Sequence, residues 1–338
     1  MARPTGRAPT LESVAERAGV SRATAGRVLS GATTVGEHAR EAVLRAAAEL
    51  SYVTNRAARS LMTRRSDSIA IVAAESEGRF FDDPYFSLVL RGAHAALAER
   101  DVQLVFSVLA GDEGRDRFER FARGGHLDGV IMVSLHGDDP MPRRLLRAGI
   151  PVMLSGRPFS PVEGLSYVDA DNLGGARSAV ELLAERGRRR LATITGPMDM
   201  IAAIDRHDGF FAELEARGMT GHGAEDGDFS MIGGRAAMHR LMAADPDIDG
   251  VFVANDLMAL GALQAVGDAG RRVPEDIAIV GFDDSPLAAE ARPAITTVRQ
   301  PIVAMGAALA ERLLDGIEQD EALPPLVMDT ELIIRDSA

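Results

Sequence analysis

The chain lacks several residue types altogether. Its 338 residues include no cysteine, no tryptophan and no lysine, and only 4% of them are aromatic. The absence of cysteine excludes disulfide bonds and thiolate chemistry. No apolar run approaches the ~20 residues that a membrane-spanning helix needs, and the segment MARPTGRAPT lacks the apolar core of a signal peptide. We therefore expect a cytoplasmic protein with no membrane segment.

Signatures of common catalytic and metal sites are missing as well. The sequence contains no Walker A loop, no H-E-x-x-H and no G-x-S-x-G, and its 7 histidines lack the spacing of metal ligands. The glycines around His222 form no dinucleotide fingerprint, because no predicted strand leads into them. We expect no catalytic residue, no metal site and no cofactor.

Charge is distributed unevenly along the chain. The formal net charge is −13, yet residues 1–65 contain 11 Arg and 5 Glu and carry +6, which leaves −19 for the remainder. A basic module attached to an acidic body fits contact with DNA at one end only.

The segment Thr10–Gly31, TLESVAERAGVSRATAGRVLSG, predicts two short helices joined by a tight turn. Gly19 tolerates a positive φ at the turn, and Ser21 is a good N-cap for the second helix. Apolar stripes with helical spacing comprise Leu11, Val14, Ala15 and Ala18, then Ala25, Val28 and Leu29. An ordinary pair of core helices is the alternative, but the opposite face of the second helix carries Arg22 and Arg27 and no acid. The pattern favours a helix-turn-helix that reads the DNA major groove.

The flanking segments complete this module. Residues 1–9 are polar and contain two prolines, so we expect a disordered arm. A third helix is predicted from about 37 to 50, and it closes a small core. Asn55 can cap a further short helix, NRAARSLMT, within a basic linker.

From Ser68 onward, apolar strands alternate with amphipathic helices, which predicts parallel sheets covered on both faces. About 270 residues with this pattern are too many for a single open sheet, so we expect an α/β body of two doubly wound lobes. The predicted strands are 68–73, 102–108, 129–133, 151–154, 190–195, 251–254, 277–281 and 332–334. The predicted helices are 86–100, 173–186, 209–217, 233–244, 256–269 and 301–316.

The motifs VAERAGVSRATAGRVLSG, YVTNRAARSLMTRRSDSIAIV, LDGVIMVS, DRHDGFFAEL, VFVANDLMALGAL, IAIVGFDDSP and TTVRQP occur in this order. Together they resemble a LacI/GalR-family transcription regulator over nearly the whole chain. The resemblance implies a DNA-binding domain at 10–54, a hinge helix and linker at 55–66, and a body at 67–338 like a periplasmic sugar-binding protein. It also implies three crossings between the lobes. The lobe nearer DNA would comprise about 67–169 and 299–324, and the distal lobe about 170–298 and 325–338.

The resemblance assigns roles on the DNA side. Arg22 and Ala23 match the variable base-reading positions and Arg27 the usual base-contacting arginine, while Thr24 would bind phosphate. The full expected DNA-binding set is Thr10, Ser21, Arg22, Ala23, Thr24, Arg27, Asn55, Arg56, Ala58, Arg59 and Leu61. In the hinge, Leu61 would insert into the minor groove, and Ala58 would let the paired hinge helices pack closely. Arg56 and Arg59 would bind phosphates. The family usually has Val-Ser where this chain has Ala25-Gly26, which puts the strength of DNA binding in doubt.

A small molecule is expected in the cleft between the lobes. Sugars need planar polar groups that bridge hydroxyls and aromatic faces against C–H surfaces. The expected ligand-binding set is Phe86, Ser134, Arg206, Asn255, Asp283 and Gln300. Arg206 matches the family's cleft arginine. Asn255 and Asp283 follow predicted strands, at the edge where open sheets bind ligands. The alternatives are an ion pair of Arg206 with Asp205 or Asp208, and helix capping by Asp283 or Asp284.

The sequence therefore predicts a homodimeric repressor of carbohydrate-use genes that a small sugar releases from a palindromic operator. The segment GPMDMIAAIDRHDGF resembles that of regulators of gluco-oligosaccharide use such as cellobiose sensors. Because the chain stops at IIRDSA without a leucine-rich tail, we expect no tetramer. A purine or other corepressor remains an alternative. A solute-binding protein is a remote alternative, which the basic N-terminal module disfavours. A sugar-modifying enzyme on the same scaffold is a third alternative.

Overall fold

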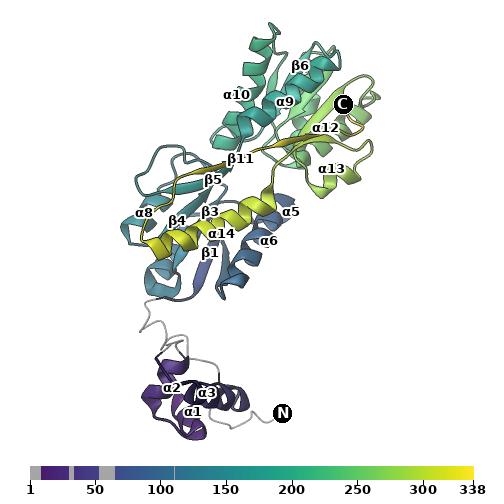
Figure 1. Cartoon of the computed structure of the whole chain (residues 1–338). Coiled ribbons are helices and arrows are strands. Elements are labelled where there is room, and N and C mark those ends of the chain that lie inside the picture. Colours follow the sequence, from purple (N-terminus) through teal and green to yellow (C-terminus); the bar gives the residue numbers. More distant parts are fainter. Residues whose placement is uncertain (1–8, 30–33, 53–64, 110) are drawn as a thin grey trace. The chain divides into compact units, whose positions relative to one another are not determined.

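The computed structural model describes residues 9–29, 34–52, 65–109 and 111–338, and the chain divides into two units, Met1–Asp67 and Ser68–Ala338 (Figure 1). Residues 1–8 of the predicted arm at 1–9 lie outside the described residues. So do five predicted DNA-binding positions, Asn55, Arg56, Ala58, Arg59 and Leu61.

Within its described residues, the first unit consists of helices α1 (Leu11–Ala18), α2 (Arg22–Leu29) and α3 (Glu37–Glu49). Thr10 caps α1: its hydroxyl accepts from the backbone N–H of Ser13, and the Ser13 hydroxyl accepts from the N–H of Thr10. Such a reciprocal cap satisfies two backbone donors that the first helical turn leaves unpaired.

Gly19 ends α1 in the left-handed region, at φ 66° and ψ 30°, as the sequence predicts. The apolar stripes then meet in a small core of Val14, Ala15, Ala25, Val28, Val43, Ala46 and Ala47. Ala15 is 5% exposed, and the small side chain lets the helices pack closely. The arrangement confirms the predicted helix-turn-helix with a third supporting helix.

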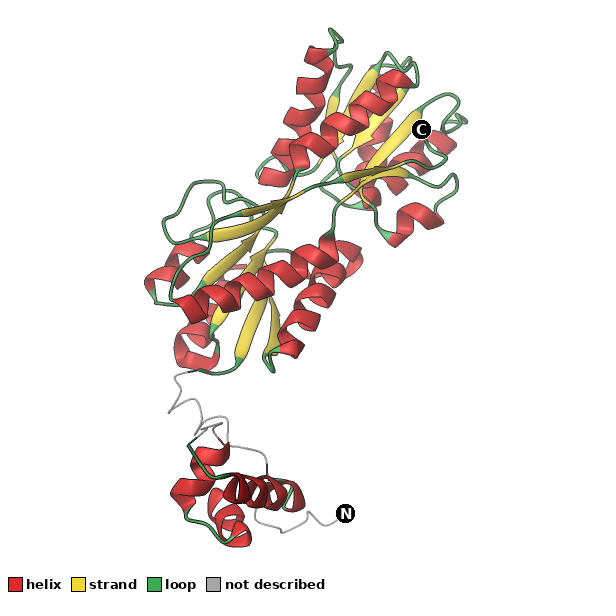
Figure 2. Cartoon of the chain, viewed as in Figure 1, coloured by secondary structure: helices red, strands yellow, loops and turns green. Residues whose placement is uncertain are grey.

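The described part of the body forms two six-stranded sheets, each the centre of one lobe (Figures 1 and 2). The first lobe's sheet has the order β11-β5-β4-β3-β1-β2 and is parallel throughout. Its strands are β1 (Ser68–Ala73), β2 (Gln103–Val108), β3 (Gly129–Val133), β4 (Val152–Ser155), β5 (Ser166–Ala170) and β11 (Leu326–Met328). The second lobe's sheet has the order β12-β10-β9-β8-β6-β7, with only β10 and β12 antiparallel. Its strands are β6 (Leu191–Thr195), β7 (Ala224–Asp226), β8 (Gly250–Val253), β9 (Ala278–Asp283), β10 (Thr296–Arg299) and β12 (Glu331–Ile333).

Helices cover both faces of each sheet (Figure 2). Those of the first lobe are α5 (Glu77–Asp82), α6 (Pro84–Glu99), α7 (Gly111–Phe121), the π-helical turn η1 (Ala122–His126), α8 (Met141–Arg147) and α14 (Ile302–Gln319). Those of the second lobe are α9 (Asn172–Glu185), α10 (Ile201–Ala216), α11 (Met231–Ala244), α12 (Asp256–Asp268) and α13 (Pro286–Glu290). The α6–α14 crossing is close enough that a Cβ on Gly92 would lie 1.9 Å from the Val303 carbonyl oxygen, so glycine is required there.

The structure confirms two doubly wound lobes but corrects details of the chain path. The family resemblance predicts the last crossing near residue 325, whereas Leu326–Met328 pairs in parallel with Val168–Ala170, so this crossing follows Met328. Helix α10 begins at Ile201, eight residues before the predicted start at 209. Its first turns contribute Ile201, Ala202 and Arg206 to the pocket described below.

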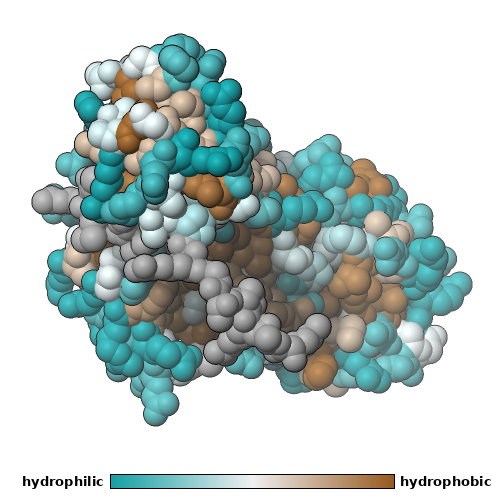
Figure 3. Space-filling view, turned by 90° about the horizontal axis from the view of Figure 1, so that it is seen from below, coloured by the Kyte–Doolittle hydropathy of each residue, from teal (hydrophilic) through white to brown (hydrophobic). Residues whose placement is uncertain are grey.

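Burial and surface hydropathy agree with this layering, in which apolar strands lie inside and helices lie outside. Residues of β3 are buried throughout, as are those of β8. In Figure 3, hydrophilic residues cover most of the face shown, and apolar residues form separate patches. Among the described helices, none is long and apolar enough to cross a membrane.

Candidate DNA-reading helix and effector pocket

The outer face of α2 presents the predicted DNA-contacting side chains. Arg22, Ala23 and Arg27 are exposed, and Thr24 is half-buried. The hydroxyl of Ser21 accepts from the backbone N–H of Thr24 at 3.1 Å and lies 2.8 Å from the Thr24 hydroxyl. Ser21 is therefore the N-cap predicted from sequence, and it also fixes the Thr24 side chain at the helix start.

Sequence reasoning missed an acid beside this face. Nε of Arg22 lies 3.0 Å from Oε1 of Glu12, which α1 supplies from its first turn. The second helix itself carries no acid, so its own composition gave no sign of the pair. The spacing of the two helices brings the carboxylate to the arginine.

The unusual Ala25-Gly26 pair has two different surroundings. Ala25 is fully buried in the three-helix core. Gly26 has room for a side chain, because a Cβ there would meet only Cδ2 of Leu11, at an ordinary 3.7 Å. Packing therefore does not require glycine at this position.

A pocket of about 730 Å³, partly open to solvent, lies between the two lobes of the body. Five of the six predicted ligand residues line it: Ser134, Arg206, Asn255, Asp283 and Gln300. Three of them follow β3, β8 and β10, Asp283 is the last residue of β9, and Arg206 lies on α10, so the structure gathers them at the carboxyl ends of parallel strands.

Phe86 was predicted wrongly as a pocket residue. It is 2% exposed and packs in the first lobe's core, with its ring centroid 4.9 Å from that of Phe80. The ring that enters the pocket belongs to the preceding residue, Tyr85. Successive residues of a helix point about 100° apart, and α6 begins at Pro84, two residues before the predicted start at 86, so Tyr85 and Phe86 lie on different sides of its first turn.

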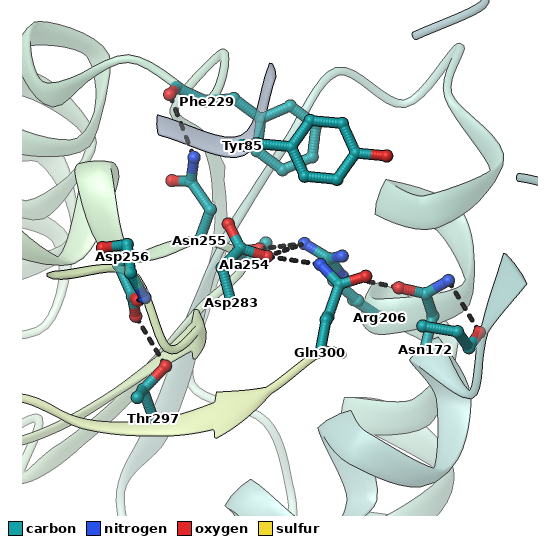
Figure 4. A network of polar contacts seen from close by, with 12 residues as sticks. Tyr85, Asn172, Arg206, Phe229, Ala254, Asn255, Asp256, Asp283, Thr297 and Gln300 are labelled. Atoms are coloured by element: carbon teal, nitrogen blue, oxygen red, sulfur yellow. Dashed lines mark hydrogen bonds and ion pairs between the residues drawn. The ribbon is translucent and has the colours of Figure 1, made fainter. Parts of the chain in front are cut away.

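Arg206 is the centre of the pocket's polar network (Figure 4). Its Nε donates to Oδ1 of Asn172 at 2.9 Å, and its Nη1 donates to the carbonyl of Ala254 at 2.5 Å. Nη1 also lies 3.6 Å from Oδ1 of Asp283, and the guanidinium stacks 3.8 Å from the Phe282 ring centroid. Neither alternative ion pair forms, because Asp205 binds Arg157 and Asp208 contacts His207.

Asp283 presents a carboxyl group to the same space. Gln300 donates its side-chain N–H to Oδ1 of Asp283, and the backbone of Asp283 has a positive φ of 111°. Burial raises its pKa to about 7, although the charge of Arg206 opposes the shift. Neither this residue nor Asp284 caps α13, whose N-cap is Ser285.

Asn255 has a structural task at the pocket wall. Its side-chain oxygen accepts from the N–H of Met258 and so caps α12, and its Nδ2 donates to the carbonyl of Phe229 at 3.2 Å. Phe229 itself has a positive φ of 62° and sits against Gly196, where a Cβ would lie 2.1 Å from the ring. Figure 4 shows the Phe229 and Tyr85 rings on the same side of the polar network. The pocket thus combines two aromatic rings with planar polar groups.

Several pocket residues escaped sequence reasoning. They are Arg79, Asp83, Tyr85, Arg157, Asp169, Asn172, Met200 and Phe229. Asp169 lies in β5, a strand that was not predicted because its sequence, SYVDA, mixes polar and apolar residues, and Asn172 begins α9 just after it. Among the described lining residues, three arginines face three aspartates, so the pocket favours an uncharged, hydroxyl-rich ligand. The described residues contain no cluster of side chains suited to a metal ion.

Comparisons with known proteins agree with this layout. Residues 10–55 match the model of bacterial regulatory proteins, lacI family, and residues 180–338 match that of a periplasmic binding protein-like domain. The HTH-type transcriptional regulator CelR of Thermobifida fusca is 45% identical over 335 residues, which cover 98% of both chains. The chain belongs to the lacI family.

Other lacI-family relatives are more distant but similarly complete. The ribose operon repressor of Escherichia coli K12 is 32% identical over 92% of this chain and 93% of its own. A solved CelR–cellobiose complex, 43% identical, superposes with a TM-score of 0.79 over 98% of this chain and 100% of that one. The lac repressor dimer bound to operator and the anti-inducer ONPF, 25% identical, gives 0.84 over 98% and 99%. These relatives are transcriptional regulators and not enzymes.

Proposed function

We propose that the chain is a homodimeric transcriptional repressor that binds a palindromic operator and is released by a small neutral saccharide, with cellobiose as the first candidate. The decisive observation is the pocket between the lobes, where Arg206, Asp283 and Gln300 form a planar polar network beside two aromatic rings. The cellobiose in the solved CelR complex supports this choice.

On the DNA side, we assign residues 10–54 to DNA binding, 55–66 to the hinge and 67–338 to the effector-binding body. Arg22 and Arg27 would contact base edges, with Ala23 between them, while Thr10, Ser21 and Thr24 would bind phosphates. The hinge positions Asn55, Arg56, Ala58, Arg59 and Leu61 retain the roles expected from the resemblance.

Exposed apolar side chains on the body support a dimer. Phe81 is 70% exposed and Phe106 is 44% exposed in the first lobe, and Ile232 is 81% exposed beside Met231 in the second. A contiguous exposed apolar patch marks an interaction surface, and the Phe81 and Phe106 rings both pack against the ring of Phe80. The dimer of the related lac repressor supports the same assignment.

In the proposed mechanism, the saccharide bridges the two lobes and favours their closed arrangement. A ligand shifts this equilibrium only by its difference in affinity for the two states, typically about 1–3 kcal/mol in allosteric proteins. The closed body would then weaken operator binding through the hinge.

The test is fluorescence anisotropy with DNA from upstream of the gene, with and without cellobiose. We expect specific binding at moderate salt and release by cellobiose. Binding that a purine strengthens would instead establish the corepressor alternative. No specific binding to that DNA at low salt, with or without ligand, would contradict the repressor function altogether.

A further inference from the structure

A cluster of ionisable side chains joins the two lobes at the edge of the pocket. In the first lobe it contains Glu75, Arg79, Ser134 and His136, and in the second lobe Asp199. We refer to these five residues as the His136 cluster. Arg79 lines the pocket and stacks 4.9 Å from the Phe229 ring centroid, so the cluster is contiguous with the proposed ligand site.

His136 has a carboxylate on each side of its ring. Nε2 lies 3.0 Å from Oε1 of Glu75, and Nδ1 lies 2.9 Å and 3.0 Å from the two carboxylate oxygens of Asp199. A neutral imidazole has one N–H donor and one acceptor nitrogen, whereas the imidazolium ion has two donors. Only the protonated ring can donate to both carboxylates, and a neutral ring must turn a lone pair toward one of them.

The contact with Asp199 spans the lobes. A backbone bond from the N–H of Gly137 to the carbonyl of Asp199, at 2.7 Å, reinforces it without depending on protonation. Glu75 is 7% exposed and also accepts from Ser134 and Arg79, so it stays fixed within the first lobe. Opening the lobes therefore separates His136 from Asp199 and leaves the Glu75 contact intact.

From this geometry, we propose that His136 is a proton-operated latch: its protonation holds the lobes together, so effector binding is linked to proton uptake at this cluster. Lobe movement itself does not rest on the identity of the effector, whereas the effect on ligand affinity rests on the proposed function.

Electrostatics give the direction of the effect. The hydrogen bond to Glu75 raises the pKa of His136 above its ordinary 6.5, the bond to Asp199 adds to this, and partial burial opposes both. Burial penalises ionised Glu75, but hydrogen bonding to His136 and the charge of Arg79 hold its pKa below the ordinary value. The acid nearest in sequence, Asp138, is occupied by Arg143 at 2.8 Å. The latch is thus complete below pH 6.5 and is lost as the pH rises through the raised pKa of His136.

Lobe separation can be measured without any ligand. Because the chain has no cysteine, Arg147→Cys and Glu215→Cys place one dye on an exposed position of each lobe. Full-length labelled chain, diluted into unlabelled chain, reports energy transfer within one chain. We expect the dye separation to increase between pH 6 and pH 8, and to change less over this range in His136→Gln. A pH-independent separation in the parent protein, or an unchanged pH profile in His136→Gln, would overturn the proposal.

Calorimetry with cellobiose as the probe tests the consequence for binding. One linked proton lowers the affinity for cellobiose by at most tenfold per pH unit. Asp283 titrates both in the parent protein and in His136→Gln, so the difference between their two pH profiles isolates the contribution of His136. Surface-exposed His239→Gln serves as control and should keep the parental profile. Asp199→Ala, at a half-exposed position, should also flatten the profile if His136→Gln fails to fold. A parental profile in Asp199→Ala would contradict the latch, whereas absence of cellobiose binding at every pH would contradict the proposed effector and leave the dye measurement decisive.

Discussion

Glu12 of α1 and Arg22 of α2 form an ion pair, with 3.0 Å between Oε1 and Nε. Both side chains are more than half exposed, so the pair contributes little to folding stability. Its position matters more, because it anchors one side of the guanidinium on the helix proposed to read bases. In the proposed complex, the outer Nη atoms would be left to face a guanine.

We predict that Glu12→Gln reduces base discrimination. Loss of the anchor frees the Arg22 side chain, and an exposed pair of about 0.2–1 kcal/mol corresponds to a roughly 1.5- to 5-fold loss. Anisotropy titrations of matched and singly mismatched operators measure it. Glu16→Gln removes the same charge from the same helix and is the control. Equal discrimination in both variants would show that Glu12 does not position Arg22.

Gly26→Ala should stabilise the DNA-binding unit by about 1 kcal/mol, because glycine is a poor residue inside a helix and Gly26 has room for a methyl group. Gly19→Ala should have the opposite effect, since Gly19 has a φ of 66° that alanine adopts only with strain. Thermal unfolding of the two variants gives both signs. A destabilised Gly26→Ala protein would mean that α2 needs its glycine.

Arg206→Met should abolish the response to cellobiose and leave operator binding intact. The guanidinium is 5% exposed and fixes Asn172 and Asp283, so its removal unmakes the polar network. Anisotropy with increasing sugar reports both properties. Arg235→Met, at a half-exposed pair with Asp268, is the matched control. A normal cellobiose response in Arg206→Met would remove Arg206 from the site.

Phe229→Leu should weaken cellobiose binding several-fold, because a leucine side chain cannot offer a flat face to the sugar's C–H surface. Phe86→Leu should instead lower the melting temperature while affinity is unchanged, since that ring lies in the core. Calorimetry and thermal unfolding of both variants separate the two roles. The reverse pattern would restore Phe86 as the stacking residue.

Helices and strands whose apolar residues follow one clear pattern were predictable from the sequence. Continuous apolar strands such as Gly129–Val133 and the striped helix α1 appear within a residue or two of the expected bounds. The strands β5, β7, β10 and β11 were not identified, because they are short or mix polar with apolar residues. Edge and cleft strands owe their existence to pairing with neighbours, which periodicity does not reveal.

The same distinction applies to the site. Arg206, Asn255 and Asp283 follow or adjoin clearly predicted strands and helices, so their convergence could be expected. The Glu12–Arg22 pair and the His136–Asp199 contact join residues from separate elements, and only the folded arrangement shows them. Phe86 was one helical position away from Tyr85, an error that exact helix register alone could correct.

The crossings between lobes lie against each other. The N–H of Asp171, at one crossing, donates to the carbonyl of Met328 at 2.8 Å, and the Thr330 hydroxyl donates to the carbonyl of Asp171 at 3.3 Å. Two of the crossing segments are thus hydrogen-bonded to each other, so a rotation of one lobe about an axis close to these bonds would leave the bonds intact. The displacement of an atom in such a rotation grows with its distance from the axis. A small rotation at the crossings would therefore produce a large movement at the far ends of both sheets.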